Sequence, residues 1–389
     1  MKKQESDVLI LGGGFGGVKA ALELAGDSRF EITLMSDQAN FRFYPSLYRT
    51  ATGGKKAASA IPLKEIFEAK KVALVKDQAL SLDRSKQSVK GASGKNYSYD
   101  VLIIALGMVT NFFGIKGLGQ YAFGIKTVDE AQALRQHIQQ QLLNGKPGNL
   151  NYVVIGGGPT GVELAGALPE YIRHLTRRHN LKKPPVHVDL VEALPRLVPR
   201  MPKSYSLAVQ KRLRRLGVKL YLKQAVKAQT ADALMLEDHS IASHTVIWTA
   251  GVTNHPFLKA NDFRLNDLGQ AVVDQYLKAE DNIYVIGDNA GTPYSGMAQT
   301  ALYDGILIAA NLKRQASGKS PQAYKPKKPV YITPVGRNWA AVQWGGLHIY
   351  GWLGWVLRTA ADFVAYHDLE PWWPASQHWM AESQQESEP

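Results

Sequence analysis

The chain has 389 residues, of which 45% are hydrophobic and 20% charged, a composition typical of a globular protein with a substantial core. It contains no cysteine, which excludes catalytic thiols, redox disulfides, iron–sulfur clusters and cysteine zinc sites, and no metal site is expected. The net charge of +13 favours an anionic partner, but the sequence has no nucleic-acid-binding motif, so an anionic membrane face or an acidic metabolite is expected rather than nucleic acid.

The first predicted elements are a strand, a glycine-rich turn and a helix. The first seven residues are polar and the apolar run 8–11 is too short for a signal peptide, so none is expected. The turn has the spacing Gly-x-Gly-x-x-Gly at Gly12, Gly14 and Gly17. In such turns the first glycine permits a tight bend, the second lets a pyrophosphate approach, and the third packs the helix on the strand. The helix N-terminus then attracts the phosphates.

The same pattern returns between residues 151 and 165. Gly156, Gly158 and Gly161 take the three glycine positions, and Gly156 follows Gly12 by 144 residues. Two further matching strands end at Gly107 and Gly251, which are also 144 residues apart. Equal offsets at two independent places predict a duplicated unit with two dinucleotide sites.

Within each unit, alternating segments with turn residues follow the second strand. Residues 72–97 and 218–238 are both interpreted as antiparallel meanders. Strands, glycine turns and helices in this order predict an α/β fold with small excursions of β structure.

The residue that ends the second strand of each unit is expected to meet the adenosine ribose. In the second unit this residue is Glu192, whose carboxylate would accept hydrogen bonds from a free ribose diol and repel a 2′-phosphate. NADH is therefore predicted over NADPH, with the nearby Arg196 as a reason for caution. In the first unit Ser36 takes that place and Asp37 follows, and either could make the contact.

Taken together, the tandem glycine turns, residues 282–288 and residues 298–301 resemble the type II NADH:quinone oxidoreductases. These proteins belong to the flavoprotein superfamily with two dinucleotide-binding domains, and the resemblance covers nearly the whole chain. It implies two Rossmann-like domains, with the NAD domain inserted in the FAD domain, and a C-terminal membrane-associating segment. The implied divisions are 1–118 and 256–329 for the FAD domain, 119–255 for the NADH domain, and 330–389 for a hairpin, an amphipathic anchoring helix and an acidic tail.

The resemblance also assigns residues to FAD in the first unit and to NADH in the second. For FAD it implies Gly12, Gly14, Phe15, Gly16, Gly17, Ser36, Asp37, Ala105, Gly107, Gly287, Asp288, Ala298 and Gln299. For NADH it implies Gly156, Gly158, Pro159, Thr160, Gly161, Glu163, Glu192, Ala250 and Gly251. Residues 40–48 with Gly53 follow the family's pattern for part of the flavin pocket.

Three residues are implied to act on the reacting groups. Gln299 opens a helix beside the isoalloxazine ring, near the place where quinone arrives, and Glu163 matches a family glutamate between nicotinamide and flavin. Glu163 could equally be a first-turn carboxylate favoured by the helix dipole. Tyr303 stands where family members usually have a second glutamine, a departure that bears on the quinone site.

The implied reaction is hydride transfer from NADH to FAD, followed by reduction of a membrane quinone, either menaquinone or ubiquinone. The proton donor to the quinol could be Glu163, Tyr303 or water. Two alternatives remain: a reductase of a soluble electron carrier, and a redox-signalling protein that binds FAD and NADH with little turnover. Sulfide:quinone oxidoreductases and disulfide reductases need cysteines and are excluded.

The C-terminal part of the chain holds most of the tryptophans. Residues 338–357 are twenty residues without a formal charge and contain four of the eight tryptophans, enough length to span a bilayer. However, Gly345 and Gly346 lie between two alternating runs and predict a hairpin, and strand backbone cannot be left unpaired in lipid.

From Gly351 the pattern turns helical, with one broad apolar face formed by Trp352, Trp355, Val356, Ala360, Phe363 and Val364. Arg358 and Asp362 are expected on the opposite, solvated face, as an ion pair worth only a few tenths of a kcal/mol. The pattern predicts a helix lying in the membrane interface, extended by Trp372, Trp373 and Trp379. A dimer interface or a lid over the core is the alternative.

The predicted protein is therefore peripheral, at the cytoplasmic face of the cell membrane, attracted to anionic lipid and possibly homodimeric. Its acidic end, residues 382–389, is expected to be disordered.

Overall fold

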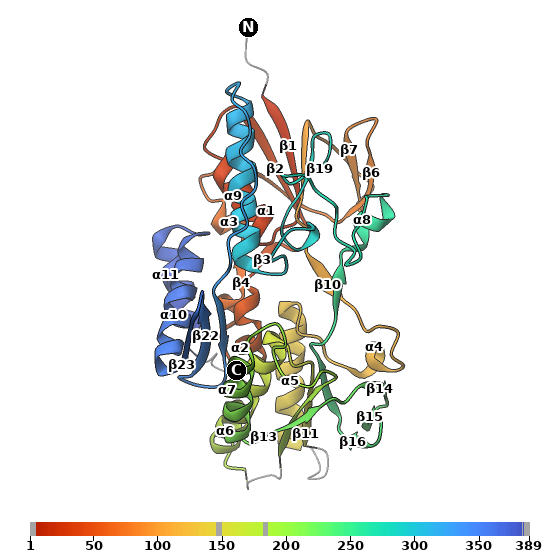
Figure 1. Ribbon diagram of the computed structural model, residues 1–389, viewed down its shortest axis with the longest axis vertical. Coiled ribbons are helices and arrows are strands. Elements are labelled where there is room, and N and C mark those ends of the chain that lie inside the picture. The colour runs from red at the N-terminus through yellow and green to blue at the C-terminus, as the bar shows by residue number, and fades with distance from the viewer. Residues whose placement is uncertain (1–4, 145–149, 182–185, 383, 385–389) are drawn as a thin grey trace.

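The computed structural model describes residues 5–144, 150–181, 186–382 and 384. Two lobes lie along the long axis of the molecule, and each contains a parallel sheet (Figure 1). The C-terminal unit, in dark blue, lies against one side of both lobes. This arrangement confirms the predicted α/β fold class.

The first lobe is built on a six-stranded sheet in the order β19-β20-β9-β1-β2-β5, in which only β19 is antiparallel to its neighbour. Its strands are β1 (Ser6–Leu11), β2 (Phe30–Ser36), β5 (Ala73–Lys76), β9 (Val101–Ile104), β19 (Lys278–Glu280) and β20 (Ile283–Val285). Helices α1 (Phe15–Leu24) and α9 (Ala298–Gln315) pack together on one face of it. Because side chains alternate along β1, Val8 and Ile10 enter this core and Leu9 and Leu11 enter the core on the other face.

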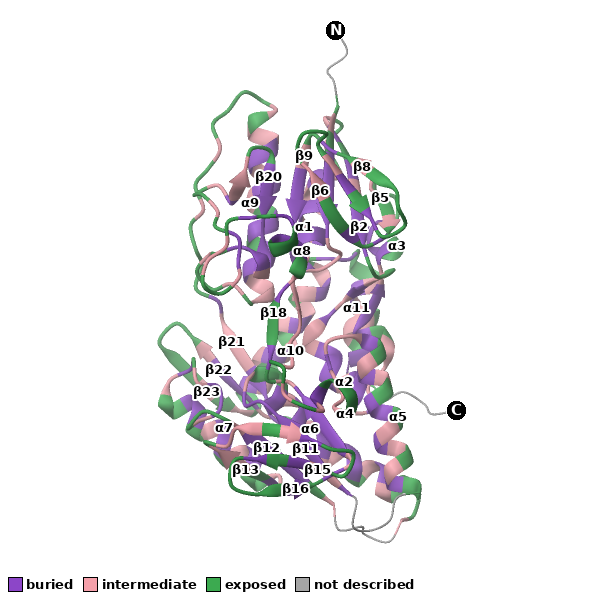
Figure 2. Cartoon of the chain, turned by 90° about the vertical axis from the view of Figure 1, so that its right-hand side faces the viewer, coloured by how far each residue is buried: buried purple, intermediate pink, exposed green. Residues whose placement is uncertain are grey.

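The second lobe repeats this plan with a four-stranded parallel sheet in the order β13-β12-β11-β17. Its strands are β11 (Asn151–Ile155), β12 (His187–Glu192), β13 (Val218–Leu222) and β17 (Thr245–Trp248). One face is covered by α5 (Val128–Asn144), α6 (Pro159–Arg178) and α7 (Lys203–Arg215). Figure 2 shows the strands of both sheets as mainly buried.

Strand pairing confirms that the two lobes share one duplicated unit. Leu11 of β1 pairs with Ile104 of β9, and Ile155 of β11 pairs with Trp248 of β17. Each residue of the second pair follows its counterpart by the same 144 residues that separate the glycine turns. The two units therefore agree in register as well as in motif.

The meander interpretation is wrong for the first strand of each segment. Residues 73–76 form β5 and residues 218–222 form β13, and both join the parallel sheets. A short apolar run has no period that distinguishes a parallel strand from the start of a meander. The antiparallel meanders are the strands that follow, namely β6 (Ala79–Asp83), β7 (Ser88–Gly91) and β8 (Asn96–Ser98), and β14 (Val226–Gln229), β15 (Ala233–Leu236) and β16 (Ser240–Ala242).

A two-stranded antiparallel ribbon connects the lobes. It consists of β10 (Met108–Thr110) and β18 (Val252–Asn254), where the chain leaves the first lobe and returns to it. The ribbon lies near the expected divisions at 118 and 255, whose positions stay a prediction. The remaining short elements are β3 (Asn40–Arg42), η1 (Tyr44–Ser46), α2 (Leu47–Ala51), η2 (Lys56–Ala58), β4 (Ala60–Pro62), α3 (Leu63–Ile66), α4 (Leu118–Tyr121), α8 (Pro256–Ala260) and η4 (Gly287–Asn289).

The C-terminal unit contains a three-stranded sheet followed by two helices. Its elements are β21 (Tyr331–Pro334), β22 (Ala340–Trp344), β23 (Leu347–Gly351), α10 (Trp352–His367) and α11 (Trp372–Glu382). Gly345 and Gly346 form the turn of the β22–β23 hairpin, as predicted. Within the described part of the chain, no helix combines the length and apolar character needed to cross a bilayer.

This unit is supported by α6. A Cβ on Gly166 would lie 2.8 Å from the Gly336 nitrogen, so only glycine permits this approach of helix and backbone. Beside it, the Tyr205 hydroxyl of α7 donates to the Ala341 carbonyl at 2.8 Å. Helices α6 and α7 of the second lobe are thereby fixed against the strands that lead to α10.

Helix α10 has its charged residues inside and its apolar residues outside. Arg358 and Asp362 are 6% and 2% exposed and form an ion pair, so the expected solvated pair is wrong. Trp352 and Leu353, in contrast, are more than 60% exposed. The prediction assumed that a charged face meets water, whereas here it meets η1 and α11.

The expected disorder from residue 382 onward is also wrong for Glu382 itself. This residue ends α11 and is 7% exposed. Of the acidic end, residues 383 and 385–389 lie outside the described residues.

Candidate dinucleotide sites and the charged cluster between them

The two glycine turns have the same geometry. Gly12 and Gly156 have φ of +114° and +111°, which side chains rarely adopt, and a Cβ on Gly17 or Gly161 would overlap the carbonyl oxygen of that first glycine. A Cβ on Gly14 or Gly158 would meet nothing within 4 Å. The middle position of each turn is therefore the one open to a ligand.

The helices that follow these turns have uncapped N-termini. Gly14 and Gly158 are the N-cap residues of α1 and α6, and neither position has a side-chain cap. Free N–H groups at a helix start bind phosphate oxygens. Pro159 and Thr160 are exposed at the start of α6, whereas Phe15 is buried against Phe41 and Gly16 lies against α9 and Ile286.

The strand-end residues lie beside their glycine turns. Glu192 Oε2 accepts from the Gly157 amide at 2.6 Å, and Glu192 Oε1 accepts from Leu194 at 2.7 Å. Ser36 takes the same place in the first unit, since a Cβ on Gly13 would come within 2.7 Å of its hydroxyl. Asp37 instead turns outward toward Arg42, 3.7 Å away. Position alone thus favours Ser36 over Asp37 at the first ribose.

The turns that follow β9 and β17 close the two sites. A Cβ on Gly12 would overlap the Ala105 carbonyl, and one on Gly156 would lie 2.8 Å from Ala250. Asn289 links two turns of the first site, accepting from the Gly107 amide at 2.7 Å and donating to the Gly107 carbonyl at 2.8 Å. In the second site, a Cβ on Gly251 would overlap the Asn111 carbonyl.

The start of α9 meets the Gly287–Asp288 turn. The Gly287 amide donates to Asp304 Oδ2 at 2.9 Å, and burial raises the pKa of Asp304 to about 7. Ala298 is the first residue of α9, whose N-cap also lacks a side-chain partner. An anion-attracting helix start therefore stands beside Asp288.

Gln299 and Tyr303 both contact the chain that leads into the C-terminal unit, and their implied roles stay predictions. The Gln299 amide donates to the Val330 carbonyl and accepts from the Val330 amide, both at 3.2 Å, so it fixes the chain entering the C-terminal unit. Tyr303 is 39% exposed and lies beneath the Lys327 ammonium, 4.3 Å from the ring centre. Among the contacts of the described residues, neither touches Glu163.

Lys126 approaches the first site, although no sequence pattern indicates it. Its ammonium lies 4.5 Å from the ring centre of Tyr44, and Arg42 approaches the same ring at 5.7 Å. Burial lowers the pKa of Lys126, and the carboxylate of Asp288 opposes that shift. A cation from the second lobe thus lies near the first site.

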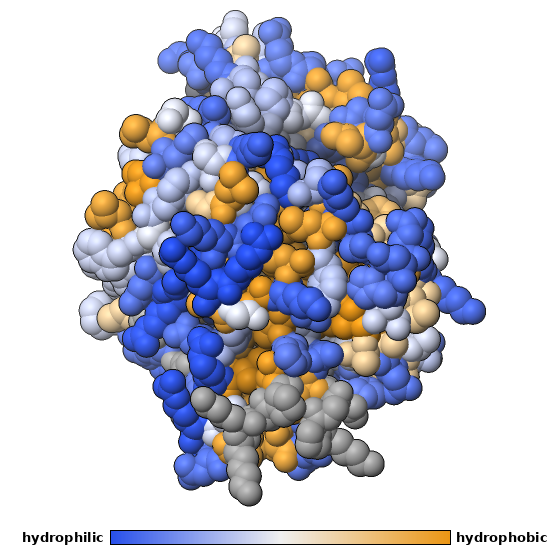
Figure 3. Space-filling view, turned by 60° about the horizontal axis from the view of Figure 1, so that its bottom comes forward, coloured by the Kyte–Doolittle hydropathy of each residue, from blue (hydrophilic) through white to orange (hydrophobic). Residues whose placement is uncertain are grey.

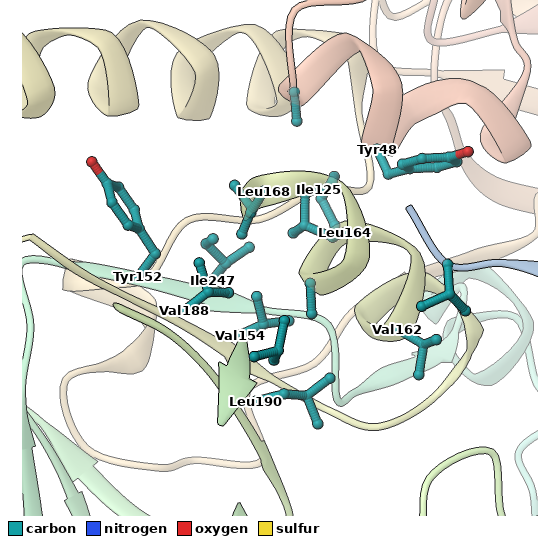
Figure 4. Close-up of a cluster of buried hydrophobic side chains, with 14 of the residues drawn as sticks. Tyr48, Ile125, Tyr152, Val154, Val162, Leu164, Leu168, Val188, Leu190 and Ile247 are labelled. Atoms are coloured by element: carbon teal, nitrogen blue, oxygen red, sulfur yellow. The ribbon is translucent and has the colours of Figure 1, made fainter. Parts of the chain in front are cut away.

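Glu163 lies in a cluster of charges that the sequence did not predict. Helix α2 packs on α6, and Figure 4 shows Tyr48 and Leu164 in one cluster of buried hydrophobic side chains. Burial raises the pKa of Glu163 to about 7; Arg358 and Arg49 act to lower it and Glu382 acts to raise it. Charged groups from three segments far apart in sequence therefore act on this carboxyl group.

The two turns fit two dinucleotides. Each offers a glycine with open space above it, uncapped helix N–H groups and a polar residue at the ribose position. The first site adds Asp288 and the α9 N-terminus. No cluster of potential metal ligands occurs in the residues that the structure describes.

Comparison with known proteins agrees with this geometry. The family described as pyridine nucleotide-disulphide oxidoreductase matches residues 6–305. Among relatives, type II NADH:quinone oxidoreductase NdhA of Mycobacterium tuberculosis is 27% identical, over 93% of this chain and 84% of its own. The type II NADH:quinone oxidoreductase of Staphylococcus aureus is 27% identical, over 84% of this chain and 86% of its own. These relatives confirm the resemblance drawn from the motifs.

Two solved structures share the fold. NDH2 from Plasmodium falciparum in complex with NADH gives a TM-score of 0.87 at 16% identity, covering 97% of each chain. The sulfide:quinone oxidoreductase of Aquifex aeolicus gives 0.78 at 21% identity, covering 92% of this chain and 89% of that one. The chain belongs to the pyridine nucleotide-disulphide oxidoreductase family.

Proposed function

We propose that this protein is a peripheral-membrane, non-proton-pumping type II NADH:quinone oxidoreductase that binds FAD in the first lobe and NADH in the second. The single observation that carries the proposal is the position of Glu163. It stands one turn inside α6, after the second glycine turn, within electrostatic range of Arg358 and Glu382 of the C-terminal unit. The named relatives, at 27% identity over most of the chain, support the same activity.

When bound, FAD supplies the two-electron chemistry that connects NADH oxidation to quinone reduction. The chain's own residues bind and orient: the Gly12–Gly17 turn and the α1 N-terminus hold one pyrophosphate, and Gly156–Gly161 with α6 hold the other. Glu192 accepts from the ribose diol of NADH. Lys126 and Asp288 hold opposite charges at the flavin end of the first site.

Glu163 is assigned the proton that the quinone needs, because its raised pKa keeps a proton available near neutral pH. Gln299 is assigned a positioning role, since both ends of its amide bind the Val330 backbone. Tyr303 is exposed at the surface of the first lobe, with the Lys327 ammonium over its ring. We assign it to the edge of the quinone site.

The outer surface of the C-terminal unit supports membrane attachment. Its exposed large apolar residues are Trp344, Leu347, Tyr350, Trp352, Leu353, Val356, Val364, Trp372, Trp373 and Met380. Figure 3 shows apolar patches among near-neutral side chains at the left edge, on the side where this unit lies in Figure 1. A surface of this kind lies in the headgroup region and is held additionally by anionic lipid. We assign it to the cytoplasmic face, with a homodimer as a further possibility for the same chain.

The proposal is tested by purifying the protein with its flavin and following NADH oxidation with a short-chain menaquinone or ubiquinone analogue. Quinone-dependent turnover is the expected result. Flavin reduction by NADH without reoxidation by quinone would instead favour the redox-signalling alternative. Reoxidation by a small iron–sulfur protein but not by quinone would favour the soluble-carrier reductase.

A further inference from the structure

The C-terminal end of α11 reaches the interior of the protein. Glu382 ends α11, and its Oε1 accepts a hydrogen bond from the Ser46 hydroxyl at 2.5 Å. The Arg49 Nε lies 3.4 Å from the same oxygen, and the Arg49 Nη1 donates to the Glu382 carbonyl at 3.4 Å. Glu382 thus attaches α11 to the segment that joins η1 and α2.

A second arginine approaches Glu382 from α10. The Arg358 Nη2 lies 4.0 Å from Glu382 Oε1 and donates to the Pro45 carbonyl at 3.2 Å, while its Nη1 pairs with Asp362. The Arg358 guanidinium is therefore shared between two carboxylates, Asp362 and Glu382, whereas Arg49 pairs with Glu382. Removing one carboxylate from such a buried set leaves an arginine charge without its partner. That charge then favours ionisation of any other carboxyl group nearby.

That nearby carboxyl group is Glu163. The charged groups acting on it are Arg49 from α2, Arg358 from α10 and Glu382 from α11. Two phenols also lie within electrostatic range of it: Tyr48 from α2 and Tyr205 from α7. Burial is the main cause that favours the protonated form of Glu163; Arg358 and Arg49 favour the ionised form, and Glu382 adds a smaller effect toward the protonated form.

We propose that Glu382 is a positioning residue for quinone reduction. It pairs with Arg49 and Arg358, so that Glu163 stays protonated and can give a proton to the quinone. The inference rests on the proposed function. In that reaction NADH, one proton and quinone give NAD⁺ and quinol. One quinol proton derives from the hydride of NADH, and the other comes from water by way of Glu163. The O–H bond of the Glu163 carboxyl group breaks as the quinol O–H bond forms, and a proton from water then restores the Glu163 carboxyl group.

The membrane-facing helix α11 is in this way part of the active site. Its outward tryptophans, Trp372 and Trp373, are exposed at one end, and Glu382 is buried at the other. The carboxylate that pairs with Arg49 and approaches Arg358 belongs to α11, so it takes this place only when α11 packs against α2 and α10.

The test separates the two half-reactions in the flavin-loaded full-length protein by stopped flow. Flavin reduction by NADH is followed first, and reoxidation by menadione is then followed between about pH 5.5 and 9. In the wild type, reoxidation is expected to fall with a midpoint near the Glu163 pKa of about 7. In Glu382→Gln the midpoint moves about one unit lower, so that reoxidation at pH 8 falls about tenfold while flavin reduction is unchanged.

Two further variants serve as the conservative change and the matched control. Glu382→Asp keeps the charge one methylene farther from both arginines, so a smaller shift in the same direction is expected; it is the test if Glu382→Gln does not fold. Glu370→Gln removes another buried carboxylate that holds α11, paired with His378 at 2.9 Å, without touching either arginine. Its midpoint is expected to match the wild type.

The outcomes are distinguishable. Wild-type flavin that menadione never reoxidises overturns the proposed function, and this inference with it. Normal wild-type turnover with an unshifted midpoint in the Glu382 variants overturns the inference alone. An equal shift in Glu370→Gln also overturns it, because loosening of α11 would then suffice.

Discussion

Arg358 and Asp362 form an ion pair on the buried face of α10, directly beneath a surface of exposed tryptophan and leucine. An amphipathic helix in water has the reverse arrangement. The helix therefore has two different environments to satisfy: a polar protein interior and an apolar exterior.

Breaking this pair should destabilise the protein. Asp362→Asn leaves the Arg358 guanidinium without its main buried partner, and we expect a loss of about 3 kcal/mol in the free energy of unfolding. Replacing both residues, with Arg358→Met and Asp362→Leu, should cost less than the single change because no buried charge is left over. Urea titration of the wild type and the two variants measures the difference, and a double variant that loses as much stability as Asp362→Asn would contradict the explanation.

Adding a methyl group at the open position of a glycine turn should block the ligand and leave the fold intact. The Cβ of Gly158→Ala meets no protein atom within 4 Å, so the thermal midpoint is expected to be unchanged. The methyl group would occupy the approach of the NADH pyrophosphate, raising KM for NADH by about tenfold, which corresponds to about 1.4 kcal/mol. Gly161→Ala, whose Cβ would overlap the Gly156 carbonyl, should instead prevent folding of the second lobe.

Preference for NADH should depend on Glu192. Glu192→Gln keeps an oxygen for the Gly157 amide but removes the negative charge that repels a 2′-phosphate. The ratio of kcat/KM for NADH to that for NADPH is expected to fall at least about tenfold. Steady-state kinetics with both nucleotides measures it. An unchanged ratio would mean that another group, such as Arg196, determines the choice.

Membrane attachment should depend on the exposed tryptophans of α11. Trp372 and Trp373 are 68% and 66% exposed, and replacing both by serine should weaken binding to phosphatidylglycerol–phosphatidylcholine vesicles by at least about tenfold. Leu268, which is 73% exposed and lies in the first lobe, gives the control: Leu268→Ser should bind as the wild type does. Co-sedimentation compares them, and equal loss in both would argue against a specific surface.

Stability should fall as the pH rises through the titration of Asp304. Burial raises its pKa from 3.8 to about 7, so the folded chain retains a proton that the unfolded chain releases. The resulting stabilisation is complete below about pH 4 and is lost as the pH approaches 7, by up to about 4 kcal/mol. Asp304→Asn should remove this dependence, so its advantage over the wild type grows from pH 4 to 8. Unfolding free energies measured across that range test the sign.

The glycine turns could be predicted from sequence because their constraints are local. A positive φ at Gly12 and the overlap at Gly17 involve residues only five apart, and the motif records both. The duplication was visible for the same reason, since each copy repeats its own local rules at a fixed offset. The hairpin at Gly345 and Gly346 likewise follows from neighbouring residues.

The charged cluster could not be predicted in this way. Arg49 and Glu382 are separated by more than 300 residues, and nothing in either segment indicates the other. Arg358 was misplaced because a charged face was assumed to meet water. That assumption fails where the outer surface is apolar. Lys126 was missed because a single lysine before a helix has no distinctive spacing.

The contact between Gly166 and Gly336 determines how far the second nucleotide turn lies from the C-terminal unit along α6. Gly158, at the nucleotide turn, and Gly166, at the C-terminal unit, are eight residues apart on one continuous helix, or about 12 Å of rise. A single helix therefore sets the spacing between the second nucleotide turn and the C-terminal unit. Under the proposed function, the NADH anchor and the unit assigned to the membrane are held at this fixed spacing, so no moving domain is needed to bring them together.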